Sequence, residues 1–151
     1  MGYLDVITLP TAKNHLRIDS GFTADDEAIQ RMITSALELI EHNTSHILFA
    51  RDKTYYKTVD NDRIVVFDYP INHTDTDVTA LHYSLRHEYV SDTITLNVGY
   101  SLPEDVPSPL IDAALMMLED WYFESETEGR KFTISDQVNR ILFNYKRCIV
   151  S

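Results

Sequence analysis

The chain has 151 residues, a length that favours one domain spanning residues 1–151. Its composition, 44% hydrophobic and 25% charged, is typical of a globular protein and excludes disordered and fibrous classes. The formal net charge of −11 argues against unspecific phosphate binding, because such binding needs clustered Lys and Arg. The start of the chain has no signal-peptide pattern and no apolar run approaches membrane-spanning length, so we expect synthesis and folding in the cytoplasm.

The N-terminal part of the chain predicts two helices. Leu9–Ile18 is typical of a short helix, which Asp19, Ser20 and Gly21 end. Thr23 with the acids at 25–27 is a strong helix-start signal, because it combines a capping hydroxyl with negative charge at the positive end of the helix dipole. Apolar residues then recur at steps of three and four until about residues 42–45. They are Ile29, Met32, Ile33, Ala36, Leu37 and Ile40.

The middle of the chain, from Ile47 to Tyr100, is rich in β-branched and aromatic residues and predicts strands. Asp60 and Asp62 lie in a turn signal between the first two of them. We therefore expect a small, mostly antiparallel four-stranded sheet between the helices. Its strands are expected at Lys53–Val59, Ile64–Phe67, Val78–Arg86 and Thr93–Val98.

A third helix is predicted from Ser108 to about Glu124, because Ser108 can cap it and Pro109 suits its first turn. Its apolar residues cover more than one side, whereas a small domain usually buries one side of a helix. We expect another copy of the chain to cover the second side. The alternative is a central helix enclosed by its own subunit. The expected interface residues are Ala113, Met116, Met117 and Trp121.

A fourth helix is predicted after Ser135, which can cap it. The order helix, helix, four strands, helix, helix indicates a mainly helical α+β fold. The charge changes sign along this half, because residues 87–129 contain no Lys or Arg while Arg140, Lys146 and Arg147 follow. Such a dipolar subunit could pair head to tail with its own copy, and the alternative is two independently solvated faces.

The search for catalytic chemistry finds one weak candidate, a metal site of Glu38, His42 and His46. The residue after His42 is Asn43 rather than the glutamate of a zinc protease, and the helix is expected to end near this point. Cys148 is the only cysteine and has no expected base partner, and the four glycines form no phosphate-binding loop. We therefore expect no enzyme, no cofactor and no metal, and keep a metal-dependent hydrolase as the alternative.

Three stretches resemble the head-tail connector, or head-completion adaptor, family of tailed bacteriophages. The first is Leu9–Asp19 with the acidic helix start and the helix running to Ser45. The second is Thr95–Tyr100 followed by Val106-Pro107 and the helix through Tyr122, and the third is Val138–Arg147. The chain departs from the family pattern at Ser45-His46 and in the acidic Phe123–Glu126.

The resemblance implies a non-enzymatic virion protein of the neck. It would form a ring of twelve copies, dock on the portal after DNA packaging, extend the DNA channel and offer a platform to a stopper or tail-completion protein. A stopper or tail-completion protein of the same neck is a further alternative. The expected portal-docking residues are Arg140, Lys146, Arg147, Ile149 and Val150. Acidic side chains would repel DNA in such a channel, and the candidates to line it are Asp60, Asp62, Glu124, Glu126 and Glu128.

Overall fold

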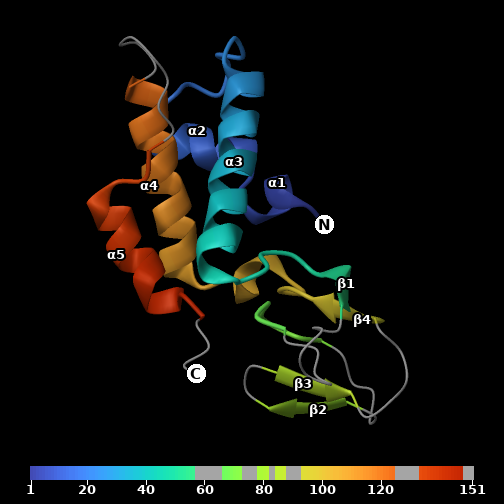
Figure 1. The fold of residues 1–151 in the computed structure, drawn as a ribbon. Coiled ribbons are helices and arrows are strands. Elements are labelled where there is room, and N and C mark those ends of the chain that lie inside the picture. The colour runs from blue at the N-terminus through green and yellow to red at the C-terminus, as the bar shows by residue number, and fades with distance from the viewer. Residues whose placement is uncertain (57–65, 73–77, 82–83, 88–92, 125–132, 148–151) are drawn as a thin grey trace.

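The computed structural model describes residues 1–56, 66–72, 78–81, 84–87, 93–124 and 133–147. Within these ranges it contains five α-helices, a short 3₁₀ helix and four strands (Figure 1). The helices are α1 (Tyr3–Val6), α2 (Leu9–His15), α3 (Asp26–Thr44), α4 (Ser108–Glu124) and α5 (Asp136–Tyr145), with η1 at Pro103–Asp105. The strands are β1 (Arg51–Tyr56), β2 (Val78–Leu81), β3 (Ser84–His87) and β4 (Thr93–Val98).

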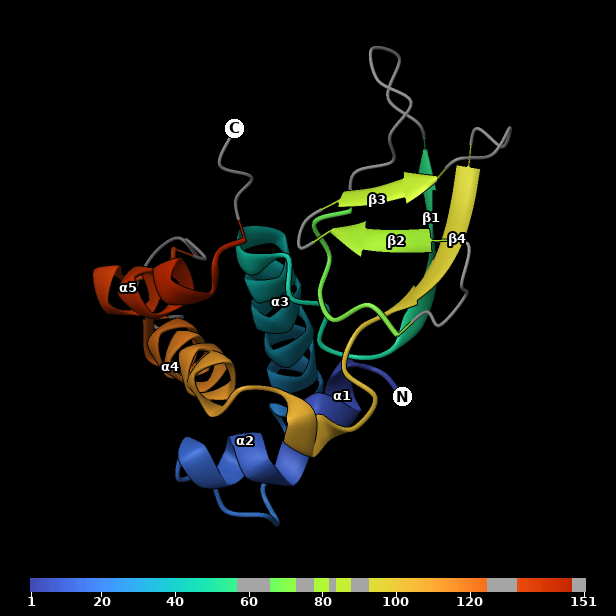
Figure 2. The same cartoon turned by 90° about the horizontal axis from the view of Figure 1, so that it is seen from below.

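The helices form one module around the long pair α3 and α4, which lie side by side and run in opposite directions (Figures 1 and 2). The fully buried side chains of α3 follow the predicted 3.6-residue period, so that helix was read correctly from the sequence. α1, α2 and α5 pack around the pair, and all five helices contribute to one hydrophobic cluster. Among the described residues, no helix is both long and apolar enough to cross a membrane.

The helix starts differ in part from the predicted ones. Ser135 caps α5 as expected, because its side-chain oxygen accepts a hydrogen bond from the backbone N–H of Val138. α3 begins at Asp26, three residues after Thr23, and its N-cap Asp25 accepts a hydrogen bond from the hydroxyl of Tyr122 at 2.8 Å instead of capping the helix. A contact from a distant helix thus took the place of the local cap.

The buried Lys13 connects the end of α2 to the start of α3. Its ammonium group donates to the carbonyl oxygens of Ser20 and Phe22 and to the carboxylate of Asp26 at 2.8 Å. All three donors of the ammonium therefore have acceptors, which is what allows a lysine to be buried. This arrangement holds the loop between the two helices.

The prediction of one four-stranded sheet is wrong. β1 pairs with β4 and β2 pairs with β3, so the described strands form two separate two-stranded antiparallel sheets. The segment expected as one strand at Val78–Arg86 is divided into β2 and β3, and residues 66–67 of the predicted second strand are not in a strand. The predicted turn with Asp60 and Asp62 lies outside the described residues. Alternation identifies a strand but not its partner, and here the residues that pair with β1 lie 37 to 47 positions further along the chain, from Tyr56 with Thr93 to Arg51 with Val98.

The β1–β4 sheet has a small core of its own. Leu96 and Val98 of β4 are fully buried against Ile47 and Val66, whereas Thr95 faces outward and pairs with Thr54 across the strands at 3.0 Å. The alternation predicted for β4 is therefore confirmed. The segment 66–72 covers this sheet without joining it as a strand, because it makes only isolated bridges at Tyr69 and Ile71.

Candidate functional site

A polar cleft of about 340 Å³ lies where the helical module meets the β1–β4 sheet. It is lined from α1, from the last turns of α3 and the residues after it, from β1, and from the 66–72 segment. The lining residues are Tyr3, Glu38, Glu41, His42, Ser45, Ile47, Arg51, Lys53 and Asp68.

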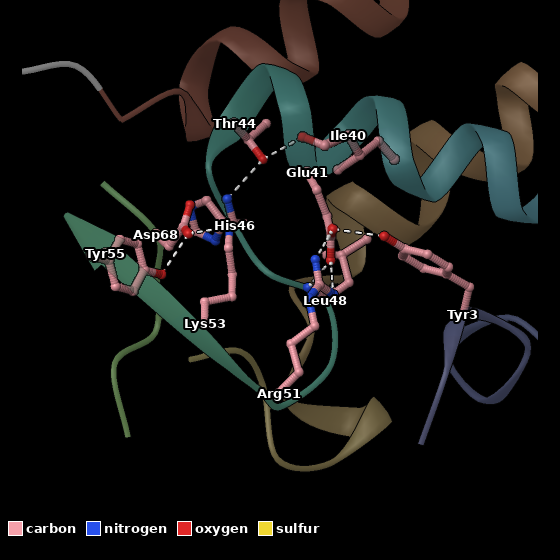
Figure 3. A network of polar contacts seen from close by, with 10 residues as sticks. All are labelled: Tyr3, Ile40, Glu41, Thr44, His46, Leu48, Arg51, Lys53, Tyr55 and Asp68. Carbon is pink, nitrogen blue, oxygen red and sulfur yellow. Dashed lines mark hydrogen bonds and ion pairs between the residues drawn. The ribbon is translucent and has the colours of Figure 1, made fainter. Parts of the chain in front are cut away.

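Glu41 organises one side of this cleft from the last turn of α3 (Figure 3). Only 8% of Glu41 is exposed, and its carboxylate accepts hydrogen bonds from the hydroxyl of Tyr3 and the backbone N–H of Leu48, each at 2.8 Å. The guanidinium of Arg51 donates to both carboxylate oxygens, at 3.0 and 2.6 Å. The four contacts join α1, α3 and the start of β1, so one buried carboxylate holds the helical module to the sheet.

The electrostatics of this network keep its charges in place. Burial lowers the pKa of Arg51, but hydrogen bonding and attraction to Glu41 outweigh it and the pKa lies above its ordinary value. Burial also raises the pKa of the Tyr3 hydroxyl, and the neighbouring carboxylate of Glu41 raises it further. Both shifts favour a charged guanidinium and a neutral phenol at neutral pH, and both groups donate to the carboxylate of Glu41.

Asp68 forms a second polar contact set on the opposite side of the cleft (Figure 3). Its carboxylate accepts from the ammonium of Lys53 at 2.5 Å and from the hydroxyl of Tyr55 at 2.6 Å. Burial raises the pKa of Tyr55, and the hydrogen bond to Asp68 adds to this. These contacts fasten the 66–72 segment to β1, so the cleft wall does not depend on backbone pairing alone.

His46 is the centre of an aromatic cluster behind the cleft. It follows Ser45, which takes the left-handed conformation (φ 59°), and its Nδ1 lies 2.7 Å from the hydroxyl of Tyr100. The rings of Tyr69 and Tyr145 contact the imidazole edge-to-face, with centroids 5.3 and 5.6 Å away. The cluster thus joins the end of α3, the 66–72 segment, the residues after β4 and the end of α5.

The C-terminal end of the described chain is attached to the same cluster. Arg147 places its guanidinium 4.4 Å from the ring centroid of Tyr69, and its backbone N–H donates to the carbonyl of Thr44 at 3.2 Å. Burial, together with the positive charge of Arg147, lowers the pKa of His46 to about 4. His46 is therefore a neutral structural ring at neutral pH.

We predict that His46 makes the protein less stable in mild acid. Its pKa is about 4 in the folded chain and 6.5 ordinarily, so between these values the unfolded chain binds more protons. The free energy of unfolding then falls as the pH decreases from 6.5 to 4, in total by ~3 kcal/mol. Urea denaturation across this pH range should show a flatter profile for His46→Gln than for the unchanged chain. The exposed His42 provides the control His42→Gln, which should keep the original slope; parallel profiles for all three proteins would contradict the prediction.

The arrangement of Glu38, His42 and His46 does not support the metal-hydrolase alternative. Glu38 and His42 are exposed on α3, whereas His46 lies beyond the helix end and is buried with its Nδ1 engaged by Tyr100. In the parts of the chain that the structure describes, no three His, Cys, Asp or Glu side chains are grouped as metal ligands. The helical spacing that suggested the site does not reach His46, because α3 ends at Thr44, two residues before it.

The residues expected at a subunit interface lie mostly in the core of their own chain. Ala113, Met117 and Trp121 are buried on α4, and only Met116 is half-buried. α3 covers one side of α4 and α5 covers another, so the enclosed-helix alternative explains the two apolar sides. For the three buried residues, contact with a second copy would require the helices to separate. Met116 alone keeps a surface that a second copy can reach.

The expected docking and channel residues are described only in part. Arg140 and Lys146 are exposed, Arg147 is half-buried against Tyr69, and Glu124 is exposed at the end of α4. The other expected residues, namely Ile149, Val150, Asp60, Asp62, Glu126 and Glu128, lie outside the described residues.

The sequence analysis did not identify Glu41 as a site residue, although a signal was present. Glu41 lies four residues after Leu37 on the apolar stripe of α3, so an acid stands where the pattern calls for an apolar side chain. A carboxylate on a buried face needs donors from elsewhere in the chain. The partners themselves, Tyr3 and Arg51, were not predictable from helical spacing.

The fold is thus a helical bundle that a buried charge network joins to the β1–β4 sheet. A family model described as phage gp6-like head-tail connector protein matches residues 6–86, more than half of the 151-residue chain. The chain belongs to this family, and it is a bacteriophage virion protein of the head–tail junction.

Solved structures agree with this fold. A chain in a structure titled "Virion of native gene transfer agent (GTA) particle" superposes with a TM-score of 0.72 at 14% identity, covering 97% of this chain and 92% of that chain. A chain in "Neck of empty GTA particle computed with C6 symmetry" superposes with a TM-score of 0.70 at 16% identity and the same coverage of 97% and 92%. Identities this low show a shared fold alone. A search of curated proteins finds no match.

Proposed function

We propose that the chain is a ring-forming adaptor of the phage neck that docks on the portal after DNA packaging, extends the DNA channel and carries the next neck or tail protein. The observation that carries the proposal is the family match over residues 6–86. It is supported by the fold shared with a chain of a gene transfer agent neck, whose C6 symmetry is compatible with twelve copies. The adaptor has no catalytic step, since docking and channel formation need only surfaces.

The surface charge supports a DNA channel rather than a DNA-binding site. The formal net charge is −11, and Glu124 is an exposed acid at the end of α4. We propose that acidic side chains face the lumen, with Glu124, Asp60, Asp62, Glu126 and Glu128 as the candidates. Fixed negative charge repels phosphates over about a Debye length of roughly 8–10 Å, so DNA would slide without adhering.

We propose that the C-terminal segment from Lys146 onward docks on the portal, with Arg140 nearby on α5. Residues 140–147 contain three basic side chains and no acidic one, and the apolar Ile149 and Val150 follow. Tyr145 and Arg147 must be kept in any test, because they hold the end of α5 against His46 and Tyr69. The informative deletion therefore begins after Arg147.

A chain that ends at Arg147 is expected to fold normally and to lose portal docking. Removal of the four residues 148–151 takes away the apolar end of the docking segment but none of the contacts described above. Thermal unfolding should be unchanged, while co-sedimentation with purified portal rings should fall at least tenfold. A control with Ser151 alone removed should dock like the full chain. If the chain ending at Arg147 docked as well as the full chain, the proposal that the C-terminal segment docks on the portal would be refuted.

A further inference from the structure

β4 uses its far side, the side away from β1, to bind the 66–72 segment. The N–H of Gly99 donates to the carbonyl of Pro70 at 2.8 Å, and the carbonyl of Asn97 accepts from the N–H of Asn72 at 2.9 Å. Backbone groups of successive residues in a strand point to opposite sides. The backbone groups of Val98, and of every second residue before it, therefore point towards β1.

This register leaves one edge of β1 unpaired. Arg51, Lys53 and Tyr55 lie opposite the β4 residues that point inward, so their N–H and C=O groups pair with β4. The backbone groups of Asp52, Thr54 and Tyr56 point to the other side, where no described strand pairs with them. We call the backbone groups of these last three residues the outer edge of β1.

The outer edge of β1 lacks the features that normally keep strand edges apart. β1 contains no Pro, and its unbroken register with β4 leaves no bulge. Its charged side chains are engaged within the subunit, because Arg51 and Lys53 form the ion pairs of the cleft and Asp52 accepts a hydrogen bond from a β4 side chain at 2.8 Å. Tyr56 at the strand end is 71% exposed. An unguarded edge of this kind is typical of a strand that receives another strand.

The hairpin of β2 and β3 is a second strand pair without a neighbouring strand. It forms a two-stranded sheet of its own, separate from β1 and β4 (Figure 1). A two-stranded hairpin is marginally stable by itself in water, and a third strand stabilises it. β3 contains Arg86, and charged residues disfavour edge pairing, whereas β2 contains neither a charged residue nor Pro. β2 is therefore the strand of the hairpin that is suited to a further partner.

We propose that β2 of one copy of this chain pairs with the outer edge of β1 in the next copy. The occupant is a second copy because one chain supplies both an unguarded strand to donate and an unguarded edge to receive it. The contact joins two different surfaces and is therefore heterologous, and such contacts generate rings when the rotation closes. In a closed ring each of these edges is paired. The inference rests on the proposed ring and assigns the surfaces that build it.

Cysteine cross-linking tests which strands meet. In a Cys148→Ser background, Thr54→Cys and Thr79→Cys are made as two single variants and as one double variant. Both positions lie in the middle part of their strands, so a short bismaleimide tolerates a small shift of register. It is applied to the purified full chain and to assembled necks. An equimolar mixture of the single variants should give cross-linked dimers, and the double variant should give a ladder of larger species.

Two other cross-linking patterns would overturn the proposal. Dimers from Thr54→Cys alone would show that two β1 edges meet each other. A cross-linked monomer from the double variant, with no dimer from the mixture, would show that the hairpin pairs with β1 of its own chain.

A proline on the outer edge of β1 provides an independent test. The N–H of Thr54 points outward, so Thr54→Pro removes a donor from the edge and none from the pairing with β4. The chain should stay folded by circular dichroism, and the concentration needed for assembly should rise at least tenfold. Thr54→Val is the matched control, because it also loses the hydroxyl contact with Thr95 but keeps the N–H. Its assembly should be unchanged.

The outcomes separate this inference from the proposed function. Rings that assemble normally in Thr54→Pro, with no dimer from the mixed single variants in necks, would refute the assigned edges and leave the ring intact. If particles of native mass contained no ring of this chain, the proposed function itself would fail.

Discussion

Replacement of Gly99 by alanine is expected to destabilise the protein by ~2–5 kcal/mol. Gly99 has a φ of 113°, a conformation that costs a residue with a side chain about 1–2 kcal/mol. An added Cβ would also lie 2.3 Å from the carbonyl oxygen of Phe49 and 2.9 Å from the backbone nitrogen of Ala50. Both contacts are with backbone, so no side chain can turn away, and moving a packed segment costs roughly 1–3 kcal/mol more.

The site of Gly99 explains why the chain cannot simply shift there. Its backbone N–H donates to the carbonyl of Pro70 at 2.8 Å, and the next N–H, of Tyr100, donates to the carbonyl of Ile47 at 3.1 Å. The strand end is thus held between two other segments. Urea denaturation of Gly99→Ala should show the loss, and Gly2→Ala, where an added Cβ meets nothing within 4 Å, should stay within about 0.5 kcal/mol of the unchanged chain. Equal stability of the two variants would contradict the prediction.

Replacement of Glu41 by alanine is expected to cost ~3 kcal/mol. The change leaves the Leu48 N–H and the Tyr3 hydroxyl without their acceptor and Arg51 without its counter-charge. Breaking a buried ion pair from one side typically costs about 3–5 kcal/mol. We expect the lower end of that range, because the Arg51 side chain is 29% exposed and can turn towards water. Thermal and urea unfolding measure the effect.

Glu38 provides the matched control for Glu41. It is an exposed glutamate one turn earlier on the same helix and lines the same cleft. Glu38→Ala should therefore change the free energy of unfolding by no more than about 0.5 kcal/mol. Glu41→Gln should fall between the two, since the amide oxygen keeps one acceptor and loses the charge. If Glu41→Ala behaved like Glu38→Ala, the carboxylate would not be what joins the helices to the sheet.

Both substitutions act where segments distant in the sequence meet. Glu41 joins α1, α3 and β1, and Gly99 allows β4 to pass close to the chain that enters β1. We expect the helical module to keep most of its hydrophobic cluster in either variant, because only Tyr3, Leu48 and Tyr100 of that cluster lie at or beside the altered contacts. Loss of order should therefore begin at the sheets, which hydrogen exchange of the backbone amides can resolve.

The sequence by itself determined four of the five described helices and much of their ends, whereas α1 (Tyr3–Val6) was not predicted. The stripe of α3 and the cap at Ser135 depend on residues within four positions of one another, so their signals are local and readable. The alternation of β4 was readable for the same reason. The family resemblance also rested on such helix and turn signals, and the match over residues 6–86 confirmed it.

Only the tertiary structure decided which distant segments meet. The pairing of β1 with β4 replaced the expected four-stranded sheet, and the packing of α5 and α3 on α4 explained apolar sides that had suggested a second copy. The partners of Glu41 and His46 came from α1, β1 and the residues after β4 in the same way. The physical reason is that the spacing of apolar residues along the sequence shows which face of a helix or strand is buried. The free energy that selects the element packed on that face comes from contacts between elements far apart in the chain.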